Sequence, residues 1–205
     1  MRAAGQGLDP ERAAPPFEHN PSAWSQRVSI ALLALLASAI AAYMGAFRWG
    51  WIDSVWDPVF GSGSETVLRS AESEALSGII GVPDAVLGSW AYLTEVVLAF
   101  AGSTRRWQFR PWLVVLFGID VIPLGIVSAI LVVVQGVAVG AWCFLCLVTA
   151  VISLGLVALA WDEVWASLRY LREVWRREPG GAALWRTFTG RPTPSAVRVA
   201  FELTG

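Results

Sequence analysis

Four long apolar stretches run along the chain, and polar segments separate them. The apolar stretches cover residues 28–47, 84–101, 112–135 and 140–160. Each is close to the roughly 20 residues that an α-helix needs to cross about 30 Å of hydrocarbon. The pattern therefore predicts an all-α membrane protein whose core is a bundle of four transmembrane helices. The first stretch also has the short apolar core of a signal peptide, but the apolar run continues beyond the small residues, which favours an uncleaved helix.

The polar segments at the two ends differ from each other. Residues 1–27 mix Pro, Gly, Ala and charges without apolar periodicity, which predicts a disordered tail. Residues 28–160 form the predicted transmembrane domain, with a loop over residues 48–83. In residues 161–205, apolar side chains first recur on one helical face with Arg on the other, which predicts a C-terminal amphipathic helix on the membrane surface followed by a tail. A soluble extension of the fourth helix is the alternative.

The distribution of charged residues predicts on which side of the membrane each segment lies. The chain is 56% hydrophobic and 15% charged, with a net charge of -1, which gives no basis for nucleic-acid binding. The 48–83 loop is acidic, whereas arginines gather in the turn at residues 102–110 and again after the fourth stretch. By the positive-inside rule, we expect a multi-pass cell-membrane protein with both termini in the cytoplasm. The acidic loop and a turn over residues 135–140 are then outside.

The two cysteines of the chain, Cys143 and Cys146, stand three residues apart at the start of the fourth stretch. The lone His19 lies far away in the N-terminal tail, so we expect no metal site. Leu147 follows the pair, which excludes the CxxCH attachment motif of c-type haem. A helix N-terminus stabilises a thiolate, so the pair suits thiol-disulfide exchange near the outer membrane face. Two small core side chains remain the alternative.

Several motifs beside the cysteines carry a resemblance. The sequence "WCFLC" opens the fourth stretch, "VLRS" lies in the acidic loop, and "GIIGVPDAVLGSWAYL" opens the second stretch. In this order they resemble the vitamin K epoxide reductase family over about residues 49–165. The segments "WDPVFGSGSETVL" and "RWQFRPWLVVLFG" resemble an actinobacterial branch of that family.

The resemblance implies a function and the residues that carry it. Cys143 and Cys146 match the catalytic pair, in which the deeper Cys146 faces the quinone and the shallower Cys143 passes oxidising equivalents onward. The shallower thiol is also the one that we expect a partner in water to reach easily. Ser70 matches a serine of the family's loop, and Asp84 falls where relatives carry an asparagine that binds a quinone carbonyl. The resemblance therefore implies a quinone of the menaquinone or ubiquinone type as substrate, membrane lipid as surroundings, and a separate thioredoxin-like extracytoplasmic protein as redox partner.

The sequence also departs from the family. Trp56 and Ser64 stand where the family has two loop cysteines, and neither side chain can exchange disulfides. Ala150 stands where animal enzymes carry a quinone-contacting tyrosine. We therefore expect a quinone-reducing thiol oxidoreductase, with a non-catalytic membrane scaffold or binding protein of the same fold as the alternative.

Two acidic residues lie inside predicted membrane helices. Glu95 and Asp120 are at similar depth in the second and third helices, in the half away from the cysteines. Ionisable groups are costly in hydrocarbon and are often functional there. We expect a neutral, hydrogen-bonded structural pair, with a shared proton as the alternative.

Overall fold

The computed structural model describes residues 20–204, and within that range it is helical and contains no strand. The predicted all-α fold is confirmed. Residues 1–19, which hold most of the predicted disordered tail and His19, lie outside the described range. The elements are α1 (Trp24–Arg48), α2 (Gly63–Leu68), α3 (Ala71–Ile80), α4 (Asp84–Phe100), α5 (Arg106–Phe109), α6 (Pro111–Val134), the π-helix η1 (Gln135–Val139), α7 (Phe144–Arg177), α8 (Gly181–Phe188) and α9 (Pro194–Thr204).

The helices of the described range supply three to four candidate membrane spans. Three are long and apolar enough to cross a bilayer, namely α1, α6 continued by η1, and α7. The second predicted helix, α4, has 17 residues, and it qualifies only together with α3, to which it is bent by 60°. The four predicted apolar helices thus all exist, and the one after the acidic loop is shorter and broken at its start.

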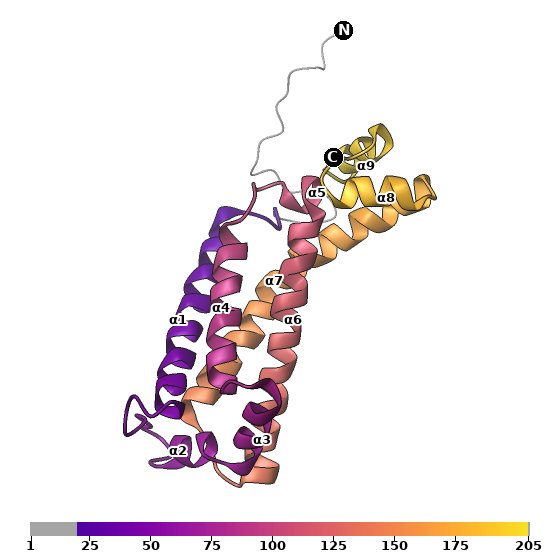
Figure 1. Cartoon of the computed structure of the whole chain (residues 1–205). Helices are drawn as coiled ribbons and strands as arrows, with labels where there is room; N and C mark the ends of the chain where they lie inside the picture. The colour runs from indigo at the N-terminus through magenta and orange to yellow at the C-terminus, as the bar shows by residue number, and fades with distance from the viewer. Residues whose placement is uncertain (1–19, 205) are drawn as a thin grey trace. The chain divides into compact units, whose positions relative to one another are not determined.

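One compact unit holds residues 29–99 and 119–160. In it α1, α4, α6 and the first half of α7 run side by side, and α2 and α3 lie at one end (Figure 1). Ser38 of α1 and Ser89 of α4 exchange hydrogen bonds with each other's carbonyl oxygens at 3.0 and 3.1 Å. A Cβ atom on Gly125 would lie 2.5 Å from Cγ2 of Val157. Small residues thus let the helices of this unit approach closely, as is common in membrane bundles.

The outer faces of the same helices are apolar and uncovered. Five side chains there are between 62% and 71% exposed, namely Leu32, Val97, Ile119, Val133 and Val151. Exposed apolar surface of this extent on several helices is unfavourable in water, whereas contact with lipid chains is favourable. The protein is therefore a membrane protein, as predicted, while the side on which each terminus lies stays a prediction.

The other compact unit holds residues 100–118 and 161–204 together with the start of α1. Its core contains a buried ion pair in which Arg106 donates from Nε and Nη2 to the two oxygens of Glu163, both at 2.6 Å. The hydroxyl of Ser22 donates to the same carboxylate. A bidentate, hydrogen-bonded geometry is the arrangement in which a buried ion pair is tolerated.

The C-terminal region differs in two ways from the prediction. The predicted amphipathic stretch is not a separate helix, because α7 continues without a break to Arg177. This outcome corresponds to the alternative, an extension of the fourth helix. Beyond it, the sequence carried no readable pattern, yet α8 and α9 form there, and the hydroxyl of Tyr170 in α7 donates to the carbonyl of Ala196 in α9.

Candidate functional site

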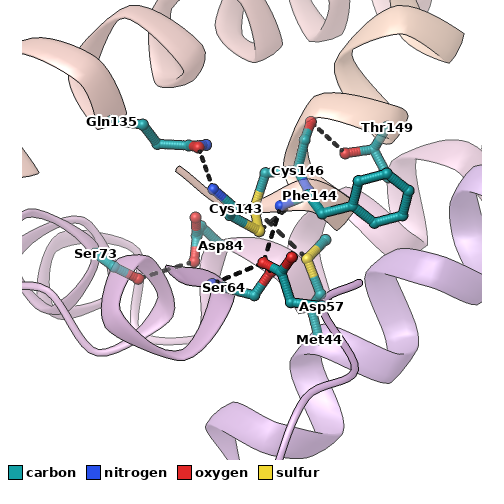
Figure 2. Close-up of a disulfide and its surroundings, with 10 residues drawn as sticks. All are labelled: Met44, Asp57, Ser64, Ser73, Asp84, Gln135, Cys143, Phe144, Cys146 and Thr149. Atoms are coloured by element: carbon teal, nitrogen blue, oxygen red, sulfur yellow. Dashed lines mark hydrogen bonds between the residues drawn. A yellow bond between two sulfur atoms is a disulfide. The ribbon is translucent and has the colours of Figure 1, made fainter. Parts of the chain in front are cut away.

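The two cysteines are joined in a disulfide at the start of α7, with their Cα atoms 5.2 Å apart (Figure 2). The sequence placed both within the helix, but α7 begins at Phe144, so that Cys143 precedes it. Cys143 caps the helix: its carbonyl accepts from Leu147 N at 3.0 Å and its Sγ from Cys146 N at 3.1 Å. The disulfide therefore lies at the amide-rich helix end, where a thiolate is stabilised.

The backbone of Cys143 is fixed from the other side by η1, the π-helix that continues α6. Its amide donates to Oε1 of Gln135 at 3.1 Å, and Gln135 is only 4% exposed. Gln135 opens the π-helix η1, and the chain then turns at Gly140, whose φ of +69° favours glycine. π-helical turns of this kind are frequent at functional sites. The sequence had predicted a plain turn over residues 135–140.

A loop that follows α1 packs against the disulfide, and Asp57 organises it (Figure 2). Oδ1 of Asp57 accepts from the amides of Val59 and Phe60 at 3.1 and 2.7 Å, which is an Asx-type turn. Oδ2 accepts from Ser64 N at 3.1 Å, from Ser64 Oγ at 2.6 Å and from Phe144 N at 3.4 Å. Asp57 therefore ties the loop to the first residue of the disulfide-bearing helix.

The electrostatics of Asp57 follow from these contacts. Burial alone would raise the pKa of this carboxyl, but the hydrogen bonds from Ser64, Phe60, Val59 and Phe144 outweigh it and lower the pKa to about 2. The carboxylate is thus ionised at neutral pH. Sequence reasoning counted Asp57 only as part of an acidic loop, because a contact across 87 residues leaves no local signal.

The two positions where the resembling family has loop cysteines are occupied by groups without sulfur. Ser64 is fully buried and bonds Asp57, as described. Trp56 is 63% exposed, and its ring stands edge-on to Phe144 with the centroids 5.9 Å apart. Its amide donates to the hydroxyl of Tyr43 at 3.1 Å. Both positions therefore hold the loop in place beside the disulfide and have no thiol chemistry.

A cavity of about 760 Å³ opens on the Cys146 side of the disulfide. Its volume is within the range of about 300–1,000 Å³ that is typical of small-molecule sites. Its walls are mainly apolar and come from α1, α3, α4, α6 and α7, and they include Met44, Asp84, Tyr92, Asp120, Gln135 and Cys146. Sγ of Cys146 is also 3.6 Å from Sδ of Met44. An apolar pocket with a few polar groups suits a flat, lipid-soluble ring.

The two cysteines differ in their access to this cavity. Cys146 is part of the cavity wall, whereas Cys143 is not and has no exposed surface. The sequence had suggested that a partner in water reaches Cys143 easily, and this is wrong for the described conformation. Asp57, Phe60 and Ser64 of the loop and the turn at Trp142 surround the N-terminal end of α7.

Asp84 and Ser70 both line the same cavity as Cys146. Asp84 opens α4, and its Oδ1 accepts from Ser73 Oγ at 3.4 Å. Ser70 is the N-cap of α3, and its hydroxyl accepts from Ser73 N at 3.3 Å. The structure thus brings both predicted residues to the cavity of Cys146, with Ser70 also serving as a helix cap.

Glu95 and Asp120 do not form the hydrogen-bonded pair that the sequence suggested. Glu95 is fully buried in α4, and neither of its oxygens has a hydrogen-bond partner among the described residues. Oδ2 of Asp120 is likewise buried without a partner there. Asp120 lines the cavity and Glu95 does not.

Within residues 20–204, no group of three or more His, Cys, Asp and Glu side chains is arranged to hold a metal ion. His19 lies outside this range. The polar groups beside the disulfide are the amide oxygen of Gln135, which accepts from Cys143 N, and the carboxylate of Asp57, which accepts from Phe144 N.

Comparison with known proteins gives one match. The model of the vitamin K epoxide reductase family matches residues 28–161, which include most of α1, the Asp57 loop, α4, α6 and the disulfide. A search of the curated proteins and a search of the solved structures each found no match.

Proposed function

We propose, because the chain belongs to the vitamin K epoxide reductase family, that the Cys143/Cys146 dithiol is oxidised to a disulfide while a membrane quinone is reduced. Members of this family are in general membrane thiol-disulfide oxidoreductases coupled to quinone. The observation that carries the proposal is the contact between the disulfide and the 760 Å³ cavity through Cys146 alone. A quinone of the menaquinone or ubiquinone type is the substrate that such a cavity in a membrane suits.

The two thiols take different roles in this reaction. The thiolate of Cys146 attacks the quinone ring and forms a carbon–sulfur bond. The thiolate of Cys143 then attacks Sγ of Cys146, which forms the disulfide and breaks the carbon–sulfur bond. The electron pair of that bond stays on the ring, which gains two electrons in all and becomes quinol when it takes up two protons.

The surroundings of the pair support this chemistry. The position of the pair at the N-terminal, positive end of the α7 dipole favours the thiolate, and the amide of Cys143 donates to Gln135. Asp84 lines the cavity and, in this proposal, faces the quinone oxygen; a carboxyl donates a hydrogen bond only when it is protonated. Ser70 holds the start of α3 at the same wall.

The oxidising equivalents leave through a separate partner in this proposal. A thioredoxin-like extracytoplasmic protein attacks the disulfide at Cys143, because no loop cysteine is present to relay it. The buried position of Cys143 requires the Asp57 loop to move before attack. The positive-inside pattern supports an extracytoplasmic position for this end of the bundle.

A second function is favoured by one observation. Trp56 and Ser64 replace the two loop thiols and are built into a well-bonded loop. A scaffold or binding protein that keeps the fold without turnover explains this loss equally directly.

Thiol trapping in native membranes separates the two functions. In the proposed enzyme, the Cys143/Cys146 pair is trapped as dithiol when quinone is depleted and as disulfide when quinone is supplied. Cys143→Ser retains quinone binding or the Cys146 adduct without turnover, whereas Cys146→Ser loses both. A pair that keeps one redox state whatever the quinone supply supports the scaffold.

A further inference from the structure

A cluster of hydroxyl groups connects α4, α6 and α7 beside the cavity, inside the compact unit of residues 29–99 and 119–160. The hydroxyl of Tyr92 lies 2.5 Å from Oγ of Ser153, and Oγ of Ser128 lies 3.2 Å from it. Ser153 also contacts the carbonyl of Thr149 at 2.9 Å, and the hydroxyl of Thr149 contacts the carbonyl of Cys146 at 3.0 Å. Tyr92, Ser128 and Thr149 line the cavity wall. Hydroxyls can both donate and accept, so a cluster of this kind can pass a proton.

The cluster leads away from the disulfide towards two carboxyl groups. Glu95 follows Tyr92 by three residues on α4, which places both side chains on one face of the helix. Asp120 lies 15 residues before Gln135, about 22 Å along α6 from the level at which Gln135 bonds Cys143. A quinone ring at Cys146 is therefore out of reach of Asp120, yet both face one continuous cavity.

The carboxyls are not explained by packing. Glu95 is completely buried and neither of its oxygens has a hydrogen-bond partner among residues 20–204. A buried polar group that lacks a partner costs free energy, and more so when it is ionisable. An amide or an apolar side chain of similar size would be cheaper to bury at this position. Ionisable residues inside membrane helices commonly mark proton paths.

We propose that Glu95 and Asp120, together with the Tyr92–Ser153–Ser128 hydroxyl cluster, form a proton relay from the end of the bundle opposite the disulfide to the quinone cavity. This rests on the proposed function. The dithiol gives two electrons to the quinone, and the relay supplies the two protons that make it quinol. The two thiol protons leave as the thiolates form at the disulfide end. Each quinone reduced therefore takes two protons from the relay side and releases two on the disulfide side.

The relay is tested in proteoliposomes that contain quinone in the membrane and a pH-sensitive dye in the lumen. A membrane-impermeant phosphine added outside reduces only molecules whose disulfide end faces outward. We expect the lumen to become alkaline by about two protons for each quinol formed. Glu95→Gln should abolish this alkalinisation and slow quinol formation at least tenfold. Its affinity for quinone should stay within twofold of the unsubstituted protein, because Glu95 does not line the cavity.

Controls distinguish the relay from a structural role and from the proposed function. Glu74→Gln, at an exposed position of α3, should behave as the unsubstituted protein. Glu95→Gln should unfold at the same or a higher temperature, because a neutral amide is cheaper to bury, and Glu95→Asp should restore part of the rate. Quinol formation without lumenal alkalinisation, or unchanged alkalinisation in both Glu95→Gln and Asp120→Asn, overturns the relay alone. Absence of any quinol in the unsubstituted protein overturns the proposed function, and the relay with it.

Discussion

The hydroxyl of Ser64 donates a 2.6 Å hydrogen bond to Oδ2 of Asp57, at the position where related proteins carry a loop thiol. The same Oδ2 accepts from the amide of Phe144, so the loop and the disulfide-bearing helix share one carboxylate. Hydrogen bonds to an ionised group are among the stronger ones in proteins. The loop beside the buried Cys143 is thus held in place by hydrogen bonds to one carboxylate, and we expect its opening to control access to the sulfur.

Asp57→Asn tests this closure. The amide nitrogen of Asn would replace Oδ2 and face the N–H donors of Ser64 and Phe144, which makes those contacts unfavourable. We expect the free energy of unfolding to fall by about 1–2 kcal/mol and the reduced Cys143 to react several times faster with a maleimide. Thermal unfolding and timed alkylation measure the two effects. Equal alkylation rates in both proteins would show that Asp57 does not control access.

Asp57 should also leave a pH signature. Its pKa is about 2 in the folded protein and 3.8 as the ordinary value, so the folded state prefers the ionised form. The stabilisation is fully present above about pH 4 and is lost as the pH falls towards 2. Unfolding temperatures recorded from pH 6 to pH 2.5 should therefore fall less steeply in Asp57→Asn than in the unsubstituted protein. Parallel curves would mean that other carboxyls account for acid unfolding.

Gly63→Ala should displace the loop by steric overlap, without any change of charge. A Cβ atom at Gly63 would overlap the carbonyl oxygen of Trp142 and lie 2.8 Å from Cβ of Phe60. Because a backbone oxygen cannot rotate away, the loop must shift from the turn before Cys143. We expect a lower unfolding temperature and faster alkylation of reduced Cys143. Gly78→Ala is the matched control, since a Cβ atom there meets nothing within 4 Å, and it should change neither quantity.

Asp84→Asn should improve quinone binding if Asp84 faces a quinone carbonyl. An amide donates a hydrogen bond without first taking up a proton, and a net gain of about 0.5–1.5 kcal/mol corresponds to roughly a two- to thirteenfold lower KM for quinone. The contact with Ser73 is kept, because the Asn oxygen still accepts. Quinone-dependent disulfide formation at a series of quinone concentrations gives this KM. An unchanged KM would place Asp84 outside the quinone contact.

The helices of this protein were predictable because apolar runs of membrane length leave a strong local signal. The starts of α7 and α3 depend on hydrogen bonds that Oε1 of Gln135, Sγ of Cys143 and Oγ of Ser70 accept from backbone amides. Composition does not reveal these bonds or the continuation of α6 as η1. α8 and α9 lack a long apolar run and were not recognised.

The candidate site was predictable only where a motif named it. Cys143, Cys146, Asp84 and Ser70 came from motifs, and the last three line one cavity. Asp57 accepts from the amide of Phe144, 87 residues away, and Gln135 accepts from the amide of Cys143, 8 residues away. Burial of Cys143 results from the folded loop, so helix position alone gave the wrong accessibility.

The sidedness of the bundle can be read with an impermeant thiol label. Ser62 and Ser103 are both exposed, and they lie in the acidic loop and in the Arg-rich turn. In the variants Ser62→Cys and Ser103→Cys, made with Cys143 and Cys146 replaced by Ser, the label should reach residue 62 from outside and fail at residue 103. Permeabilised cells should label both. Labelling at residue 103 alone in intact cells would reverse the compartment assigned to the disulfide.

The last prediction concerns the protein partner that exchanges thiols and disulfides with the Cys143/Cys146 pair. Disulfide exchange needs a thiolate to attack a sulfur through a mixed disulfide, and Trp56 and Ser64 cannot provide it. A thioredoxin-like protein must then react with Cys143 itself, which is fully buried, so loop opening precedes the exchange. Cys146→Ser leaves Cys143 without its resolving thiol and should accumulate a mixed disulfide, visible as a reducible higher band on a non-reducing gel.

The Asp57 loop provides the control for this adduct. Combining Cys146→Ser with Gly63→Ala should raise the yield of the mixed disulfide, because the displaced loop exposes Cys143, whereas Gly78→Ala should leave the yield unchanged. Cys143→Ser should give no such band, since Cys146 faces the membrane cavity and not the loop. A band in Cys143→Ser of equal intensity would assign the exchange to Cys146 and remove the need for loop opening. No band in any variant, with no quinone-dependent cycling of the native pair, would favour the scaffold.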